Sequence, residues 1–309
     1  MLEGLQKAGP TIVFDSGNAL FPFQGPQDEA TKPRAKFILE TMGKLGTKVM
    51  AAGGKDLNFG ATWLKETAAK TGVTILSANL TENGKKVFDG STVIAAGGVR
   101  VGFIGLSQPG DTVGSTPMAA TEIIPAVKEE LAKLKGKTDL VVLLAAVHQA
   151  DSFQLSAAFK TEVDFIITSS DSRGMLPAQK GDGAWLFNPG ARGQAVAQLA
   201  VKINGKGAYV DLAEVAREKE LLTSLETRLA EFEPRVKATT DPQAKALMVQ
   251  TVKDLKARRA EQKKKVDAGV SPDARTFNYE YVVLNDKVVD DAPLKVEVLK
   301  HEPTYAGSH

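Results

Sequence analysis

The sequence contains no cysteine, so disulfides, thiolate metal sites, thiol nucleophiles and thioether-linked haem are excluded within its 309 residues. Histidine is almost as scarce. Of the three histidines, His301 and His309 lie near the end of the chain, which leaves His148 as the one imidazole available to a site in the body of the protein. A metal centre built mainly from histidines is therefore excluded.

A membrane-spanning segment and a strong net charge are also missing. The longest apolar run, residues 140–147, is far shorter than the roughly 20 residues that cross a bilayer, and the first residues do not resemble a signal peptide. Lysine and arginine number 39 against 37 acidic residues, a formal net charge of +2 that gives no general attraction to nucleic acid. With 43% hydrophobic and 25% charged residues, we expect a globular protein without a membrane span or a nucleic-acid partner.

Up to about residue 205, strand-like and helix-like segments alternate, which predicts a layered α/β fold with mixed sheets. The helix-like segments are amphipathic. Gly97 and Gly98 separate two strands and predict a tight hairpin turn. The expected strands are 11–14, 47–52, 74–78, 91–96, 99–106, 139–147, 163–168 and the closing pair 185–188 and 195–203, and the expected helices include 34–45, 61–70 and 124–134.

The composition changes after residue 210, where glycine becomes rare and charged residues dominate. An apolar seam with spacings of three and four predicts one long helix, and Asp241-Pro242 predicts the start of a second, so we expect an antiparallel helical hairpin. The basic run 256–265 is interpreted as a solvated helix face. Alternating residues then predict two short strands, 276–284 and 294–299. The predicted domains are 1–210, 211–268 (the hairpin) and 269–309 (a short β segment and a linker tail).

Polar motifs follow the predicted strands at the edge where open α/β sheets bind ligands. They are Asp15-Ser-Gly-Asn18, Gly53-Gly-Lys-Asp56, Val147-His148-Gln-Ala-Asp151 and Thr168-Ser-Ser-Asp-Ser172, and the scaffold motifs are Ser77-Ala-Asn-Leu80, Val101-Gly-Phe-Ile-Gly-Leu106 and Asn188-Pro-Gly-Ala-Arg-Gly193. In order and spacing, residues 2–205 resemble the catalytic domain of the 5′-nucleotidase branch of the calcineurin-like metallophosphoesterases. The resemblance implies a metallophosphoesterase-like α/β sandwich.

The chemical part of that resemblance departs from the family, which holds two divalent metals that activate a hydroxide. The metal-bridging aspartate of the family falls on Asn18, and its asparagine ligand falls on Gly54. Its adjacent histidine falls on Lys55, while the acid that follows is kept as Asp56. The resemblance therefore implies that these positions are remnants of a metal site.

The remaining metal-ligand positions of the family also differ in this sequence. The paired histidine ligands of the family fall on Ser170 and Ser172, which flank Asp171, and only His148 falls on a family ligand. Without the resemblance, His148 is better interpreted as a hydrogen-bonded structural histidine. The resemblance places residues 1–5 in the family's first helix, so we expect this chain to lack the family's opening Asp-x-His strand and a C-terminal specificity domain of adequate length.

These observations predict a catalytically degenerate 5′-nucleotidase-like domain that serves as a binding or scaffold module, with a protein partner or self-association through the hairpin. The alternative is an active phosphoesterase with an altered metal site. No cofactor is assigned, although Asp15, Asp56, Asp151 and Asp171 could together bind one divalent cation. The tail 305–309 is similar to the segment that precedes haem attachment in multihaem cytochromes, which suggests a larger periplasmic or extracellular protein.

Overall fold

The structure is a computed structural model that describes residues 2–113, 118–169, 176–191, 193–285 and 287–302. It divides into two compact units. The first comprises Met1–Val196 and Tyr281–His309, and the second comprises Ala197–Glu280. In the described residues, no helix combines the length and the apolar character that a bilayer span requires.

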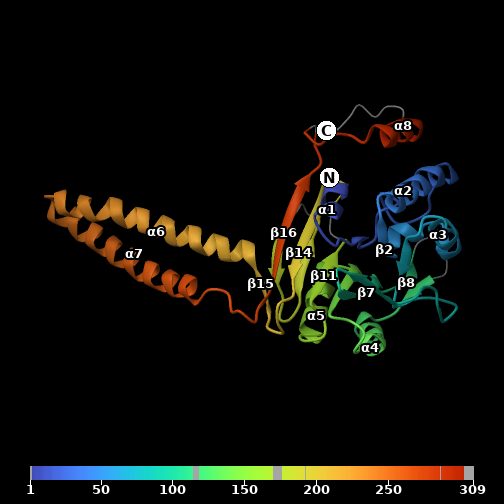
Figure 1. The fold of residues 1–309 in the computed structure, drawn as a ribbon, viewed down its shortest axis with the longest axis horizontal. Coiled ribbons are helices and arrows are strands. Elements are labelled where there is room, and N and C mark those ends of the chain that lie inside the picture. Colours follow the sequence, from blue (N-terminus) through green and yellow to red (C-terminus); the bar gives the residue numbers. More distant parts are fainter. Residues whose placement is uncertain (1, 114–117, 170–175, 192, 286, 303–309) are drawn as a thin grey trace. The chain divides into compact units, whose positions relative to one another are not determined.

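The first unit contains a small parallel sheet and its covering helices (Figure 1). The helices lie against this sheet because each buries one apolar side, for example Leu39 and Leu64, which are fully buried. The elements of this layer are β1 (Val13–Asp15), β2 (Thr47–Ala51), β3 (Thr74–Leu76), α2 (Lys32–Lys44) and α3 (Gly60–Ala68), with the short 3-10 helices η1 (Glu29–Thr31) and η2 (Gly54–Leu57).

The second sheet of this unit has six strands in the order β12-β13-β11-β10-β7-β6. Its central strands are parallel, and β12 and β6 are antiparallel to their neighbours, so the predicted mixed sheet is confirmed. The elements are β6 (Ser91–Ala96), β7 (Val99–Ser107), β10 (Leu140–Ala146), β11 (Phe165–Thr168), β12 (Leu176–Lys180) and β13 (Trp185–Asn188), with helices α4 (Ile123–Leu134) and α5 (Gln149–Ala158). The β6–β7 hairpin forms at Gly97 and Gly98, both of which have positive φ.

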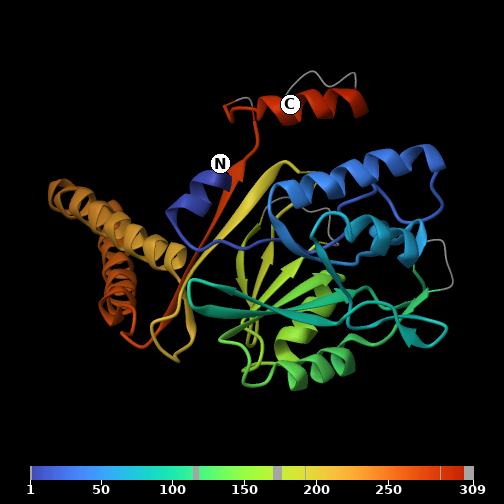
Figure 2. The ribbon, with the colours of Figure 1, turned by 45° about the vertical axis from the view of Figure 1, so that its right-hand side comes forward.

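The two sheets pack face to face, with α2 and α3 outside one and α4 and α5 outside the other (Figure 2). The Phe14 and Phe103 rings are in contact between the sheets, with their ring centroids 5.3 Å apart. This α/β sandwich is the predicted fold class. Smaller elements complete the unit: α1 (Leu2–Ala8) is the expected N-terminal helix, and β4 (Leu80–Glu82), β5 (Lys85–Lys86), β8 (Gly110–Val113) and β9 (Met118–Ala120) form a four-stranded sheet.

The second unit contains the predicted helical hairpin, α6 (Leu212–Ala238) and α7 (Pro242–Ala268). The two helices run side by side (Figure 1). Their shared seam buries Leu225, Leu229 and Leu255, and the Asp241 side chain caps α7 by accepting the Ala244 N–H at 2.7 Å. The remaining strands, β14 (Ala195–Lys202), β15 (Tyr209–Asp211) and β16 (Arg275–Val283), form a three-stranded sheet.

Two sequence predictions were wrong. Residues 294–299 were expected as a strand, but they lie in helix α8 (Ala292–His301), whose first turn is capped by Asp291 through the Leu294 N–H at 2.9 Å. In the first unit α8 lies on α2, where Lys44 pairs with Glu297 at 2.7 Å. Strands β13 and β14, expected to pair, belong to different sheets.

The end of β16 returns the chain to the first unit. The Tyr281 hydroxyl shares its proton between the carbonyls of Leu176 and Asn188, the latter at 2.7 Å. The Leu284 N–H donates to the Gln194 carbonyl at 2.9 Å. Residues 281–302 are therefore held by segments that precede the second unit in the sequence.

Candidate functional site

The carboxyl ends of β1, β2 and β11 meet in one compact group of loops. The Ser16 hydroxyl donates to the Thr168 carbonyl at 3.3 Å, and the Ser169 hydroxyl donates to the Ser16 carbonyl at 2.7 Å. Gly17 has φ +91°, and a Cβ there would lie 2.7 Å from the Ala51 carbonyl oxygen. Only glycine fits between these strand ends without displacing backbone.

Asp56 is the centre of this group and is fully buried. One carboxylate oxygen accepts the N–H groups of Asn18 at 2.6 Å and Gly53 at 3.0 Å, and the other accepts the N–H of Leu20 at 2.9 Å. Asp56 therefore ties the loop after β1 to the turn after β2.

Asn18 lies beside it in the left-handed conformation, with φ 63°. Its Oδ1 accepts the Lys55 N–H at 3.1 Å, and its Nδ2 donates to the Ser169 hydroxyl at 3.3 Å. Both ends of the amide are therefore engaged by the protein. The structure brings Asn18, Lys55 and Asp56 together.

Two acidic side chains in these loops have raised pKa values. Burial raises the pKa of Asp56 to about 7, although backbone N–H groups bind the carboxylate, and the charge of Asp15 adds to the rise. Burial likewise raises the pKa of Asp15 to about 6, opposed by its hydrogen bond from the Gly17 N–H. Both carboxyls thus titrate close to neutral pH.

Gly54, where the resemblance places an asparagine ligand of the family, is covered by another residue. Asn58 accepts the Gly25 N–H at 2.8 Å and donates to the Phe23 carbonyl at 2.8 Å, which fixes the segment between them. As a result, the side-chain amide of Gln24 lies where a Cβ on Gly54 would project. No local pattern in the sequence indicates this contact.

His148 lies in a separate group at the start of α5. It is exposed, and its described hydrogen bonds come from its main chain: its N–H donates to Gln108 Oε1 at 2.6 Å, and its carbonyl accepts from Ser152. The Gln108 amide also donates to Asp151 at 3.0 Å. The other predicted positions, Ser170, Asp171 and Ser172, lie outside the described residues.

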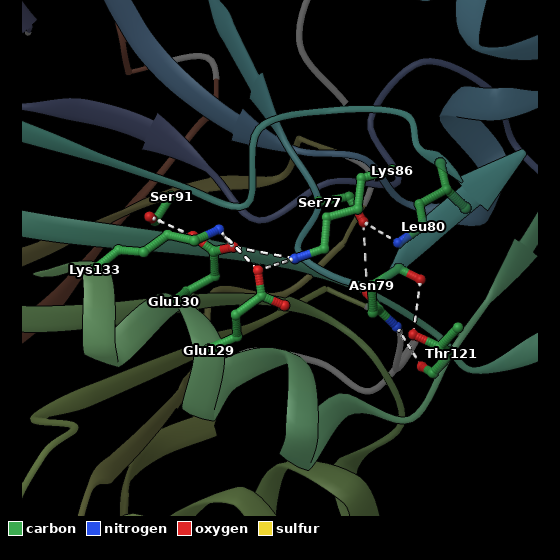
Figure 3. Close-up of polar contacts among 9 residues, drawn as sticks. All are labelled: Ser77, Asn79, Leu80, Lys86, Ser91, Thr121, Glu129, Glu130 and Lys133. Carbon is green, nitrogen blue, oxygen red and sulfur yellow. Dashed lines mark hydrogen bonds and ion pairs between the residues drawn. The ribbon is translucent and has the colours of Figure 1, made fainter. Parts of the chain in front are cut away.

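A buried network joins the ends of β3 and β7, and two of its residues, Ser77 and Asn79, were expected as part of the scaffold. The Asn79 amide donates to the Ser107 and Thr121 carbonyls, each at 2.8 Å, and the latter bond is drawn in Figure 3. The Ser107 hydroxyl donates to the Ala52 carbonyl at 2.6 Å and lies 2.8 Å from the Ser77 hydroxyl. In the sequence, this network could have been predicted from the polar residues that lie at the ends of otherwise apolar strands.

The described residues do not fit the dinuclear metal centre that the fold implies. Position 18 offers a hydrogen-bonded amide, position 54 has no side chain and position 55 carries an ammonium group. Within the described ranges, no cluster of three or more histidine and acidic side chains could hold a metal ion. The carboxylate oxygens of Asp56 and the amide oxygen of Asn18 accept N–H donors, whose partial positive charge opposes a cation at the same position.

No family model matches the sequence, and no curated protein matches it. Solved structures show the fold. A 5′-nucleotidase precursor from Thermus thermophilus aligns with TM-score 0.52 and 20% identity over 64% of this chain and 43% of that chain. The NAD nucleotidase of Haemophilus influenzae aligns with TM-score 0.54 and 17% identity over 67% and 41%. The calcineurin-like phosphoesterase YfkN of Bacillus subtilis aligns with TM-score 0.52 and 18% identity over 64% and 74%.

The chain therefore has the 5′-nucleotidase-like metallophosphoesterase fold. It spans less than half the length of the two nucleotidase structures.

Proposed function

We propose that this chain is a catalytically degenerate 5′-nucleotidase-like domain that acts as a binding or scaffold module. The observation that carries the proposal is the side-chain chemistry at positions 18, 54 and 55. The Asn18 amide is hydrogen-bonded at both ends, Gly54 has no side chain and Lys55 carries an ammonium group. These residues are a poor ligand set for divalent cations, which prefer carboxylate, carbonyl or imidazole ligands.

The consequence for catalysis follows from the chemistry of the fold. A metallophosphoesterase needs metal ions to generate the hydroxide that attacks phosphorus and to stabilise charge in the transition state. Lys55 brings a positive charge, but an ammonium group cannot supply a nucleophile at this position. We therefore expect phosphomonoesterase and nucleotidase activity at background.

The docking element in this proposal is the hairpin of residues 211–268, which follows the metallophosphoesterase-like domain proposed for residues 1–210 and precedes the segment 269–309. Apolar side chains on the hairpin stay in water: Leu221 is 49% exposed and Leu247 is 73% exposed. Such residues support contact with a protein partner or a second copy. We also propose a periplasmic or extracellular location within a larger protein, supported by the likeness of the tail 305–309 to multihaem cytochromes.

A second candidate is a phosphoesterase with one divalent cation. It is favoured by the mutual repulsion of Asp15 and Asp56, which contributes to the raised pKa of Asp56 and which a cation would relieve. Asp151 and Asp171 would have to complete the ligands.

Metal content and turnover separate the two candidates. The full chain is purified, its metals are measured, and hydrolysis of a generic phosphomonoester is followed with added Mn²⁺ or Mg²⁺. We expect background turnover in the wild type and in His148→Ala and Asp15→Asn. Robust metal-dependent turnover that either variant abolishes would overturn the proposal in favour of the active phosphoesterase.

A further inference from the structure

A hollow lies between α3 and α4, lined by residues outside the loops described above. Its volume is about 570 Å³, within the usual range for small-molecule sites. Ala68, Val73, Ile75 and Phe88 form part of its lining, and because each is at most 8% exposed, they contribute only a narrow apolar strip. The hollow can therefore contact a small apolar group along this strip.

One side of the hollow is built on a buried acid (Figure 3). The Glu130 side chain is 2% exposed, and its two oxygens accept hydrogen bonds from the Ser91 hydroxyl and the Lys133 ammonium, each at 2.7 Å. Gly90 makes this possible, because a Cβ there would collide with the Glu130 carboxyl. The acid is thus fixed in place and satisfied by the protein.

Glu129 completes this network and neutralises its charge. Lys86 and Lys133 pair with Glu129 at 2.7 and 3.0 Å, and both also reach Glu130. The hydrogen bonds from the two lysines lower the pKa of Glu129 to about 2. Two ammonium groups and two carboxylates thus balance each other, and this side of the hollow carries no net charge.

Two further charged groups line the hollow. The Lys65 ammonium lies 5.3 Å from the centroid of the Phe88 ring, and it has no carboxylate partner among the described residues. Asp89 is exposed, and it has no cationic partner in the same described ranges. Among the described residues, the lining of the hollow therefore offers one unpaired cation, one unpaired anion and a narrow apolar strip.

We propose that this hollow binds a zwitterion that carries an apolar group, of the chemical class of the aliphatic and aromatic α-amino acids. The ligand carboxylate pairs with Lys65, its ammonium pairs with Asp89, and its side chain covers the apolar lining. This charge pattern matches the lining better than a simple anion does, because Asp89 would repel a molecule with negative charge alone. The inference is independent of whether the strand-end site is catalytic.

The test uses L-leucine with the isotope-labelled full chain, followed by backbone NMR shifts. We expect millimolar binding that shifts the amide signals of Lys65, Val73 and Phe88. Leucinamide lacks the carboxylate and 4-methylpentanoate lacks the ammonium, so each should bind about tenfold more weakly.

Variants assign the contacts. Lys65→Met and Asp89→Asn should each weaken leucine binding about tenfold, and Ala69→Trp, an exposed change in the lining, should abolish it by filling the hollow. Lys70→Met, an exposed lysine on the same chain segment, is the matched control and should bind as the wild type does. The proposal is overturned if leucine leaves these signals unmoved, if leucinamide binds equally well, or if Lys70→Met and Lys65→Met behave alike.

Discussion

The side-chain amide of Gln24 occupies the space into which a side chain on Gly54 would project. Gly54 is the position at which the fold's relatives are expected to carry an asparagine ligand. Restoring that ligand therefore requires the exposed end of the Gln24 side chain to move aside.

We predict that Gly54→Asn alone lowers the free energy of unfolding by about 1 kcal/mol, because Gln24 must leave its place. The Gln24→Ala change should relieve this cost, so the double variant should be more stable than the sum of the single effects predicts. Urea unfolding of the wild type, both single variants and the double variant gives the coupling energy. Strict additivity would show that the two side chains do not compete.

Stability should fall as the pH rises toward neutrality. The folded pKa values of Asp15 and Asp56, about 6 and about 7, exceed the ordinary aspartate pKa of 3.8 that applies in the unfolded chain. The folded state therefore binds more protons than the unfolded state between these values, and deprotonation destabilises it. We expect the free energy of unfolding to decrease between about pH 4.5 and about pH 7, by up to a few kcal/mol.

The Asp15→Asn variant tests this pH dependence. It keeps the oxygen that accepts the Gly17 N–H at 2.7 Å but cannot ionise, so its stability should vary less with pH. Asp28→Asn is the matched control, because Asp28 also accepts an N–H two residues ahead, that of Ala30 at 2.9 Å, but it is exposed. An unchanged slope for Asp15→Asn in urea titrations would contradict the raised pKa.

Leu229→Asp should disrupt the hairpin of α6 and α7. Leu229 is 7% exposed in the seam, so a charge there loses its hydration, at a cost of several kcal/mol. Circular dichroism should show loss of helix. The matched change Leu247→Asp lies on the same hairpin at 73% exposure and should leave helix content intact.

Light scattering on the Leu247→Asp variant then tests the docking role. A wild-type assembly that dissociates in this variant would identify self-association.

The outcome that contradicts the hairpin is separate. If Leu229→Asp keeps its full helix content in circular dichroism, the seam does not hold the hairpin.

Local signals in the sequence predicted the elements that depend on neighbouring residues. The hairpin at Gly97-Gly98 and the helix start at Asp241-Pro242 formed as expected, because turn and cap chemistry are short-range. Residues 294–299 were predicted wrongly because six residues with alternating polarity do not distinguish a strand from a helix face.

The candidate site depended on contacts that no local pattern contains. Asn18 was expected as a ligand remnant. Its side-chain amide forms hydrogen bonds with Lys55 and Ser169, which are 37 and 151 residues away in the sequence. The position of Gln24 over Gly54 depends on the hydrogen bond from the Gly25 N–H to Asn58, which lies 33 residues further along the sequence. Such partners follow only from the folded strand order.

The return of residues 281–302 to the first unit has a consequence for biosynthesis. The bonds from Tyr281 to Asn188 and from Leu284 to Gln194 join segments that leave the ribosome before and after the entire second unit. The first unit therefore cannot close until both long helices have been translated. Helices α6 and α7 contact each other locally in the sequence and can form earlier. The first unit, whose synthesis starts first, should therefore be the last to finish folding.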